Sequence, residues 1–252
     1  MQILNRALAA LLLGASLSAH ADGLADLKSA LQRLTGQQAL RATISVKSQN
    51  RQGEGKEART DIGAASLMVD DDAQGLRLSY AADTLAQVRA EEQAREEDKK
   101  AKTPTKRGLS DLGLSQVRAM THAGESLRQE IAGAAFKGES ADTWNGRPAR
   151  LLSFDLGARQ RSAEEEEYIK KSEGSLQVWI AADGTPLESR MQMKAAGRAL
   201  LLISFEISAA SKVLFERLGD RLIATRREMQ QGGSGAGKKG EGRTEYSLQL
   251  RP

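Results

Sequence analysis

The sequence predicts an α+β protein in which a curved, partly open antiparallel sheet, a half-barrel, is covered by an N-terminal helix and a central helix. Two segments, Leu24–Leu34 and Leu114–Ile131, carry apolar residues at helical spacing. Most of the other segments alternate apolar and polar residues, which is the period of a strand with one buried face. Turn signals such as Asn145-Gly146 separate these strands, as is typical of antiparallel hairpins.

The first 21 residues have the pattern of an export signal. Arg6 supplies a basic start, Ala7–Leu17 is an apolar run, and Ala19-His20-Ala21 matches an A-x-A cleavage site. We therefore expect residues 1–21 to be removed and residues 22–252 to form a single periplasmic domain. No later run reaches the roughly 18–20 apolar residues of a membrane span, so no transmembrane segment is expected in the mature chain.

The mature chain begins with a helix and a meander of three strands. The helix has one leucine stripe, and Gly36 stands where a helix C-terminus is expected. The first strand alternates from Arg41 to Lys47, the second ends at Val69, and the third runs from Leu76 to Tyr80.

The middle of the chain is charged and predicted to be helical. The stretch at about 89–107 offers few apolar side chains, which is typical of a solvated, mobile insertion. Thr103-Pro104-Thr105 interrupts it, and Ser110-Asp111 is expected to cap a second helix. We expect that second helix to lie over the sheet as a lid through the residues on its apolar face, Leu114, Val117, Met120, Leu127 and Ile131.

From Phe136 onward the sequence is almost wholly strand and turn. Asn145-Gly146 is expected to join Phe136–Trp144 to Ala149–Leu156 in a hairpin. The connection Gly157–Gly174 pairs glutamates with lysines at i,i+4 spacing, which predicts one or two solvated helical turns. Further turns are expected at Ala196-Gly197 and in the glycine-rich segment before the last strand. The whole sheet would then have about eleven strands, enough to make an open sheet curl. The remaining strand candidates are Leu176–Ala181, Leu187–Lys194, Ala199–Ser208, Val213–Leu218, Arg221–Met229 and Glu245–Leu250.

One face of the later strands is apolar. Because side chains of a strand alternate between its faces, apolar residues two apart share one side. We hypothesise that this side lines a cavity beneath the lid helix, although the same pattern also fits a packed core. The candidate cavity residues are Val178, Ile180, Met191, Met193, Ile203, Phe205 and Ile207.

Two hairpins resemble those of a known superfamily. The first reads Thr143-Trp144-Asn145-Gly146-Arg147-Pro148-Ala149, and the second reads Val178-Trp179-Ile180-Ala181-Ala182-Asp183-Gly184-Thr185-Pro186-Leu187. Together with the order of the helices and the meander, they are similar to the LolA-like superfamily of periplasmic lipoprotein carriers and outer-membrane lipoprotein-sorting proteins. The resemblance implies a non-catalytic protein that holds acyl chains or another hydrophobic ligand between a half-open barrel and helical lids.

The residues needed for common catalytic and metal sites are scarce. His122 is the only histidine outside the export signal and is expected to be a surface or helix-packing residue, and cysteine is absent. We therefore expect neither an enzyme nor a cofactor or metal site. The formal charge of +4 is spread over interleaved acids and bases, so no nucleic-acid partner is expected.

Four segments partly match functional motifs and are better explained otherwise. Gly232 to Lys238 is similar to a phosphate-binding loop, but Lys239 replaces the Ser or Thr and a strand replaces the helix, and Gly232–Ala236 fails as a serine-hydrolase elbow. Asp70–Gly75 begins like a calcium loop without its final Glu. Glu164–Glu167 offers adjacent carboxylates that do not converge on one helix face.

Two functions remain open after this reading. The first is a soluble periplasmic carrier or sensor of a hydrophobic ligand, such as a lipid or the acyl chains of a lipoprotein. The alternative is an interaction module of a cell-envelope assembly, in which the sheet encloses a packed interior and the chain recruits an envelope protein.

Overall fold

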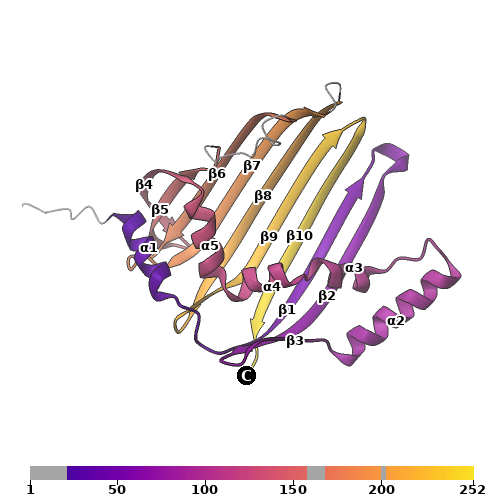
Figure 1. Cartoon of the computed structure of the whole chain (residues 1–252), viewed down its shortest axis with the longest axis horizontal. Helices are drawn as coiled ribbons and strands as arrows, with labels where there is room; N and C mark the ends of the chain where they lie inside the picture. Colours follow the sequence, from indigo (N-terminus) through magenta and orange to yellow (C-terminus); the bar gives the residue numbers. More distant parts are fainter. Residues whose placement is uncertain (1–21, 158–167, 200–202) are drawn as a thin grey trace, which may run out of the picture.

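The protein is a ten-stranded antiparallel sheet with helices packed on one of its faces (Figure 1). The computed structural model describes residues 22–157, 168–199 and 203–252. The expected export signal therefore lies outside the described residues, as does most of the connection 157–174. An α+β fold with an open antiparallel sheet, an N-terminal helix and central helices is confirmed.

Five helices and three strands make up the first half of the chain. The helix α1 (Gly23–Arg33) is capped at its N-terminus by Asp22, whose carboxylate accepts hydrogen bonds from the backbone N–H groups of Leu24 and Ala25. The following elements are β1 (Leu40–Gln52), a short 3₁₀ turn η1 (Gly55–Glu57), β2 (Arg59–Asp72), β3 (Gly75–Ser79), α2 (Ala82–Glu97), α3 (Pro104–Asp111), α4 (Leu114–Thr121) and α5 (Ala123–Ala132).

Seven strands follow, and each pairs with the next in antiparallel orientation. They are β4 (Ala135–Trp144), β5 (Arg147–Asp155), β6 (Ile169–Ile180), β7 (Pro186–Ala199), β8 (Ile203–Leu218), β9 (Arg221–Gly235) and β10 (Lys238–Leu250). The spatial order is β3-β2-β1-β10-β9-β8-β7-β6-β5-β4, so the last strand pairs with the first in the middle of the sheet. All other neighbours in the sheet are consecutive in the sequence.

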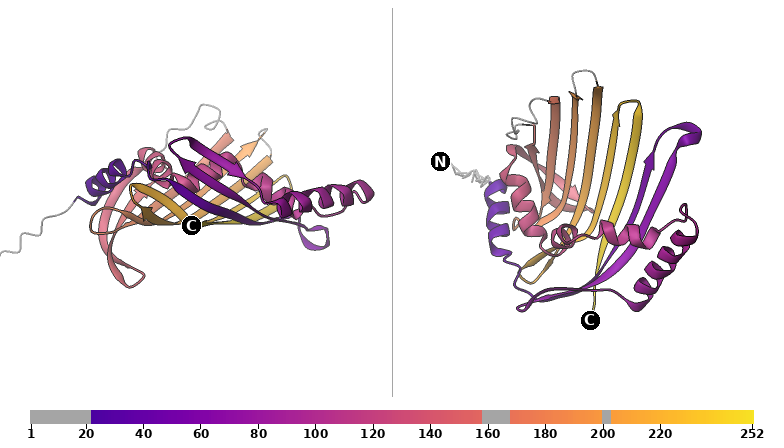
Figure 2. Two further views of the ribbon diagram at one scale, coloured as in Figure 1. Left: turned by 90° about the horizontal axis from the view of Figure 1, so that it is seen from below. Right: turned by 45° about the vertical axis from the view of Figure 1, so that its right-hand side comes forward.

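The helices cover only part of the sheet. In Figure 1, α1, α5, α4 and α3 cross the lower part of one face, and β6–β10 and the β1–β2 hairpin extend beyond them. We call the face that carries these helices the inner face and the opposite one the outer face. Helix α2 projects beyond the edge of the sheet next to β2 (Figure 2).

The core lies between the helices and the covered part of the inner face. Leu27 and Leu31 of α1, Met120 of α4 and Leu127 of α5 are at most 1% exposed and pack with the sheet residues of the same cluster. The sheet contributes Ile44, Val46, Leu67, Leu152, Leu176, Val178, Ile180 and Leu248, among others. Burial of this apolar surface is the main stabilising contribution to the fold.

Helix α3 packs directly on the backbone of β2. A Cβ atom added at Gly108 would lie 2.5 Å from the carbonyl carbon of Ala64. At the end of the helix, Asp111 accepts a hydrogen bond of 2.6 Å from the hydroxyl of Ser48, and its carbonyl accepts one from Tyr246. The charged insertion expected at about 89–107 therefore ends in a docked helix, whereas its first part lies on the exposed surface of α2.

The Gly108 contact predicts an unusual response to alanine. Gly108→Ala should lower the free energy of unfolding by about 1–3 kcal/mol, because the added methyl must displace backbone atoms. Gly124→Ala is the matched control, since its added Cβ would meet the nearest atom, the Cβ of Leu222, at an ordinary 3.6 Å. Chemical denaturation of both variants measures the difference, and equal stabilities would contradict close packing of α3.

Several boundaries differ from the expected ones. Ser110-Asp111 ends α3 instead of capping the next helix, and the expected single helix Leu114–Ile131 is broken at His122 into α4 and α5. Ala196-Gly197 lies within β7 and forms no turn. Residues 203–208 and 213–218, expected in two separate strands, belong to one long strand, β8, so the described sheet has ten strands. Ala199, expected to begin the first of these strands, instead ends β7, and residues 200–202 lie outside the described ranges. Residues 169–174, expected in a helical connection, belong to β6.

Candidate binding surface on the helix-free part of the sheet

The part of the inner face beyond the helices is an open surface formed by the far halves of six strands, β6–β10 and β1. We call it the free surface. Two rows of residues cross it from β6 to β1 in register. The first row is Gly174, Met193, Ala209, Gln231, Gly242 and Asn50, and the second is Ser172, Ala195, Ile207, Gly233, Gly240 and Gln52.

Apolar side chains are exposed on the β7–β8 side of the free surface. Met193 is 37% exposed, Ile203 is 37% exposed and Ile207 is 50% exposed. They belong to the inner face because they alternate in phase with Met191 and Val213, which pack at or in the core. Large apolar side chains gathered on an uncovered sheet face indicate a contact surface.

On the β9–β10–β1 side, glycines form the floor of the free surface. A Cβ atom at Gly242 would lie 2.5 Å from Oδ1 of Asn50 and 2.9 Å from Nε2 of Gln231, so these amide groups lie close over the bare backbone. A depression of about 420 Å³ occupies this side, with Arg107 of α3 and Ile207 of β8 among its lining residues. The free surface is therefore apolar on the β7–β8 side, and on the β9–β10–β1 side it is a shallow depression that carries amide groups.

Arg227 lies on the inner face where the helices end. Its register partners on β8 and β10 are Val213 and Tyr246, both buried in the core. Glu130 of α5 comes near its guanidinium: burial raises the pKa of the Glu130 carboxyl, and the charge of Arg227 opposes this effect. Within the described chain, Nε of Arg227 is buried without a hydrogen-bond partner, and its guanidinium makes no ion pair.

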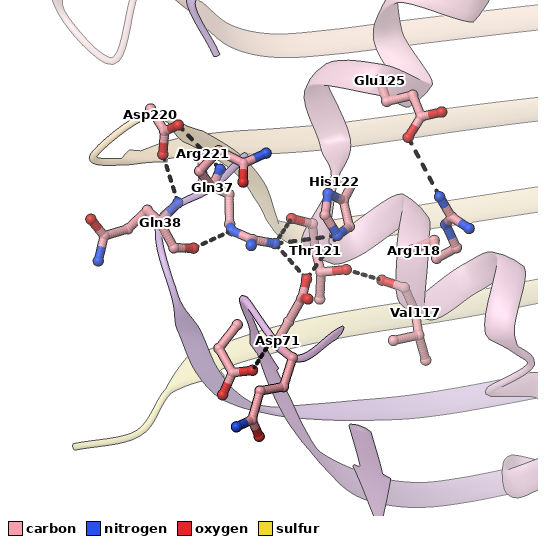
Figure 3. A network of polar contacts seen from close by, with 12 residues as sticks. Gln37, Gln38, Asp71, Val117, Arg118, Thr121, His122, Glu125, Asp220 and Arg221 are labelled. Carbon is pink, nitrogen blue, oxygen red and sulfur yellow. Dashed lines mark hydrogen bonds and ion pairs between the residues drawn. The ribbon is translucent and has the colours of Figure 1, made fainter. Parts of the chain in front are cut away.

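A polar network anchors the helices to the other end of the sheet (Figure 3). Asp71 of β2 accepts a bond of 2.6 Å from Nη1 of Arg221, and its same oxygen lies 2.7 Å from Nε2 of His122. Arg221 also donates to the carbonyls of Gln38, at 2.7 Å, and Thr121, at 3.3 Å. The network therefore connects β2, β9, the α4–α5 junction and the segment that follows α1.

In this network, His122 helps to hold the junction of α4 and α5 against the sheet. The residue sits between α4 and α5, and its ring contacts a carboxylate that is only 6% exposed. The neighbouring carboxylates of the calcium-like segment are also held by arginines, Asp72 by Arg77 at 2.6 Å and Asp70 by Arg251 at 3.1 Å. In the described ranges, no group of three or more His, Cys, Asp or Glu side chains is arranged to hold a metal ion.

A second polar cluster lies on the outer face. Glu188 of β7 is 3% exposed and accepts a hydrogen bond of 3.1 Å from the indole N–H of Trp144, and Arg190 donates to it at 2.5 Å. The indole of Trp179 donates to Asp142 at 2.7 Å and lies beneath Arg190. These contacts hold the β4–β5 hairpin, which curls away from the helices in Figure 2, against the outer face.

The seven proposed cavity residues share the inner face but fall into two groups. Val178 and Ile180 are fully buried, and Met191 packs against the same core. Met193, Ile203, Phe205 and Ile207 lie beyond the helices on the free surface, where Phe205 is half-buried against Gly197. Of the proposed lid residues, Val117, Met120, Leu127 and Ile131 are buried in the core, whereas Leu114 is 58% exposed.

The glycine-rich segment forms strand, not a loop. Gly232–Gly235 belongs to β9 and Lys238–Gly242 to β10, and the turn between them has positive φ angles at Ala236 and Gly237. Lys239 lies 3.7 Å from Glu54. No phosphate-binding arrangement of loop and helix is formed there.

Comparison with protein-family models gives no match for this chain, and neither the curated proteins nor the solved structures include a similar one. Within the described residues, no helix is long and apolar enough to cross a membrane.

Proposed function

We propose that the protein binds a hydrophobic ligand on the free surface and acts as a periplasmic carrier or sensor. The observation that carries this proposal is the exposure of Met193, Ile203 and Ile207 on a sheet face that the described helices leave uncovered. The resemblance of the two hairpins to the LolA-like superfamily supports the same class of ligand, a lipid or the acyl chains of a lipoprotein.

The position proposed for the ligand differs from the one expected from the sequence. The space beneath α4 and α5 is filled by side chains with little or no exposure, such as Met120, Leu127 and Val178. An acyl chain has more room on the open surface beside the helices than beneath them. Methionines are suited to such a surface, because their unbranched, polarisable side chains adapt to irregular apolar ligands.

The packed core also supports a second function, an interaction module of the cell envelope. In this case the free surface would bind a partner protein instead of a small ligand. The buried cluster beneath the helices favours it, since a filled interior needs no ligand for stability.

Charge substitutions on the two faces of β8 test whether the ligand binds the free surface and not the opposite face of the sheet. Ile207→Lys should weaken binding of a fluorescent fatty-acid probe about tenfold or more, because a charged group would have to be desolvated beneath the ligand. Ser208→Lys is the matched control, since the next residue of a strand points to the opposite face. Titration by fluorescence measures both affinities. A wild-type protein that binds no probe, or equal losses in the two variants, would contradict the proposal.

A further inference from the structure

Arg227 lies near the free surface, and the packing of the described residues gives its guanidinium no acceptor. Its neighbours on the same strand, Arg226 and Arg221, are held by carboxylates, with Arg226 lying 3.0 Å from both Glu228 and Glu245. For Arg227 no such pairing exists among the residues that the structure describes, and its buried Nε lacks an acceptor. A half-buried guanidinium without an acceptor loses hydration with no compensation inside the protein.

Glu130 is the acid that approaches Arg227, but it forms no ion pair with it. Their charges interact across a separation greater than the 4 Å of a salt bridge, and burial of Glu130 favours its neutral form. The guanidinium therefore remains available to a stronger acceptor that reaches it from the free surface.

The inner face offers a path from Arg227 to the exposed apolar residues. Along β9, Gly233, the partner of Ile207, lies six positions beyond Arg227, which corresponds to about 20 Å. The side chains along this path are small or flexible, and they are half-buried to exposed (Met229, Ser211, Ala209 and Met193). This length is close to that of an extended long-chain fatty acid.

We propose that the ligand of the free surface is a single-chain amphiphile with an anionic headgroup, and that Arg227 binds the headgroup while the chain lies toward Ile207. This inference rests on the proposed function, because it assigns the ligand class of the same surface. A carboxylate or a phosphate headgroup can accept two parallel hydrogen bonds from the guanidinium.

The headgroup preference is tested first on the wild-type chain. Fluorescence titration with cis-parinaric acid and with its methyl ester compares the same chain with and without the charge. We expect the acid to bind about tenfold more tightly, the usual value of a charge-assisted hydrogen bond. Displacement by palmitate and by lysophosphatidate then shows whether carboxylate or phosphate is the better headgroup.

Substitutions assign the preference to Arg227. Arg227→Gln should remove the advantage of the acid and leave binding of the methyl ester unchanged, and Arg227→Lys should restore part of it. Arg226→Gln is the matched control on the outer face, and it should keep the preference of the wild type for the acid. Far-UV circular dichroism and thermal unfolding verify that each variant is folded.

The outcomes separate this inference from the function on which it rests. Equal binding of acid and ester by the wild type, or equal loss of both in Arg227→Gln, would overturn the headgroup assignment and leave hydrophobic binding intact. Absence of binding for both probes would overturn the proposed function itself.

Discussion

Replacing Arg221 by alanine should lower the free energy of unfolding by about 3–5 kcal/mol, the largest effect we expect from a single polar substitution. Arg221 is 2% exposed and donates hydrogen bonds to Asp71 and to two backbone carbonyls, one in the segment that follows α1 and one at the end of α4. Without it, the carboxylate of Asp71 remains buried with only His122 beside it, and an uncompensated buried charge is costly.

Arg217→Ala is the matched control for this experiment. Arg217 lies on the neighbouring strand but is exposed, and its Nε donates only to the carbonyl of nearby Gly219. Its substitution should change stability by less than about 0.5 kcal/mol. Urea unfolding followed by circular dichroism measures both variants. Similar stabilities of Arg221→Ala and the wild type would show that the buried network contributes nothing to the attachment of the helices.

The second large effect is expected at Leu127. Leu127→Ala should cost about 2–5 kcal/mol, because its side chain is 1% exposed and its removal leaves a cavity in the core. Leu114→Ala should cost little, since Leu114 is 58% exposed at the start of α4. The contrast decides whether α4 and α5 form part of the folded core or act as a movable lid.

Ligand binding provides the second measurement for the same pair of variants. If α5 is core, Leu127→Ala should lose stability without a gain in affinity for the fluorescent fatty-acid probe. A variant of unchanged stability with altered affinity would instead indicate a lid that moves away when the ligand binds.

Local sequence signals predicted the elements that depend on short-range chemistry. The Asn145-Gly146 hairpin is confirmed, with φ angles of 48° and 75° at the two residues, as is the amphipathic α1. Signals that depend on distant contacts were misread. Gly197 was expected in a turn, but it lies within β7 where a Cβ would collide with the carbonyl of Tyr168 and the ring of Phe205. In this position glycine permits close approach of the backbone, which no local pattern shows.

For the candidate site, the alternation of apolar and polar residues was sufficient to predict which side chains share the inner face. It did not predict which of them are buried beneath the helices. Met193 and Ile207 share a face with Val178, as predicted. The helices cover Val178 but not Met193 and Ile207, and the periodicity of a strand does not show where a helix stops covering the sheet. Arg227 and Glu130 were missed because their meeting joins β9 to α5, about a hundred residues apart in sequence. The signal that could have found this site is Arg227 itself, an arginine at a position of β9 whose side chain points to the inner face between Val213 and Tyr246.

The pairing of β10 with β1 has a consequence for the order in which the chain can fold. Antiparallel pairing of consecutive strands allows β1–β3 and β4–β9 to form without the last strand, but these two sheets can be joined only when β10 has been synthesised and paired on both edges. Contacts of such high sequence separation form slowly, and the waiting strands β1 and β9 present unpaired backbone groups. A chaperone that shields these two temporary edges would therefore speed productive folding more than one that shields the permanent edges β3 and β4.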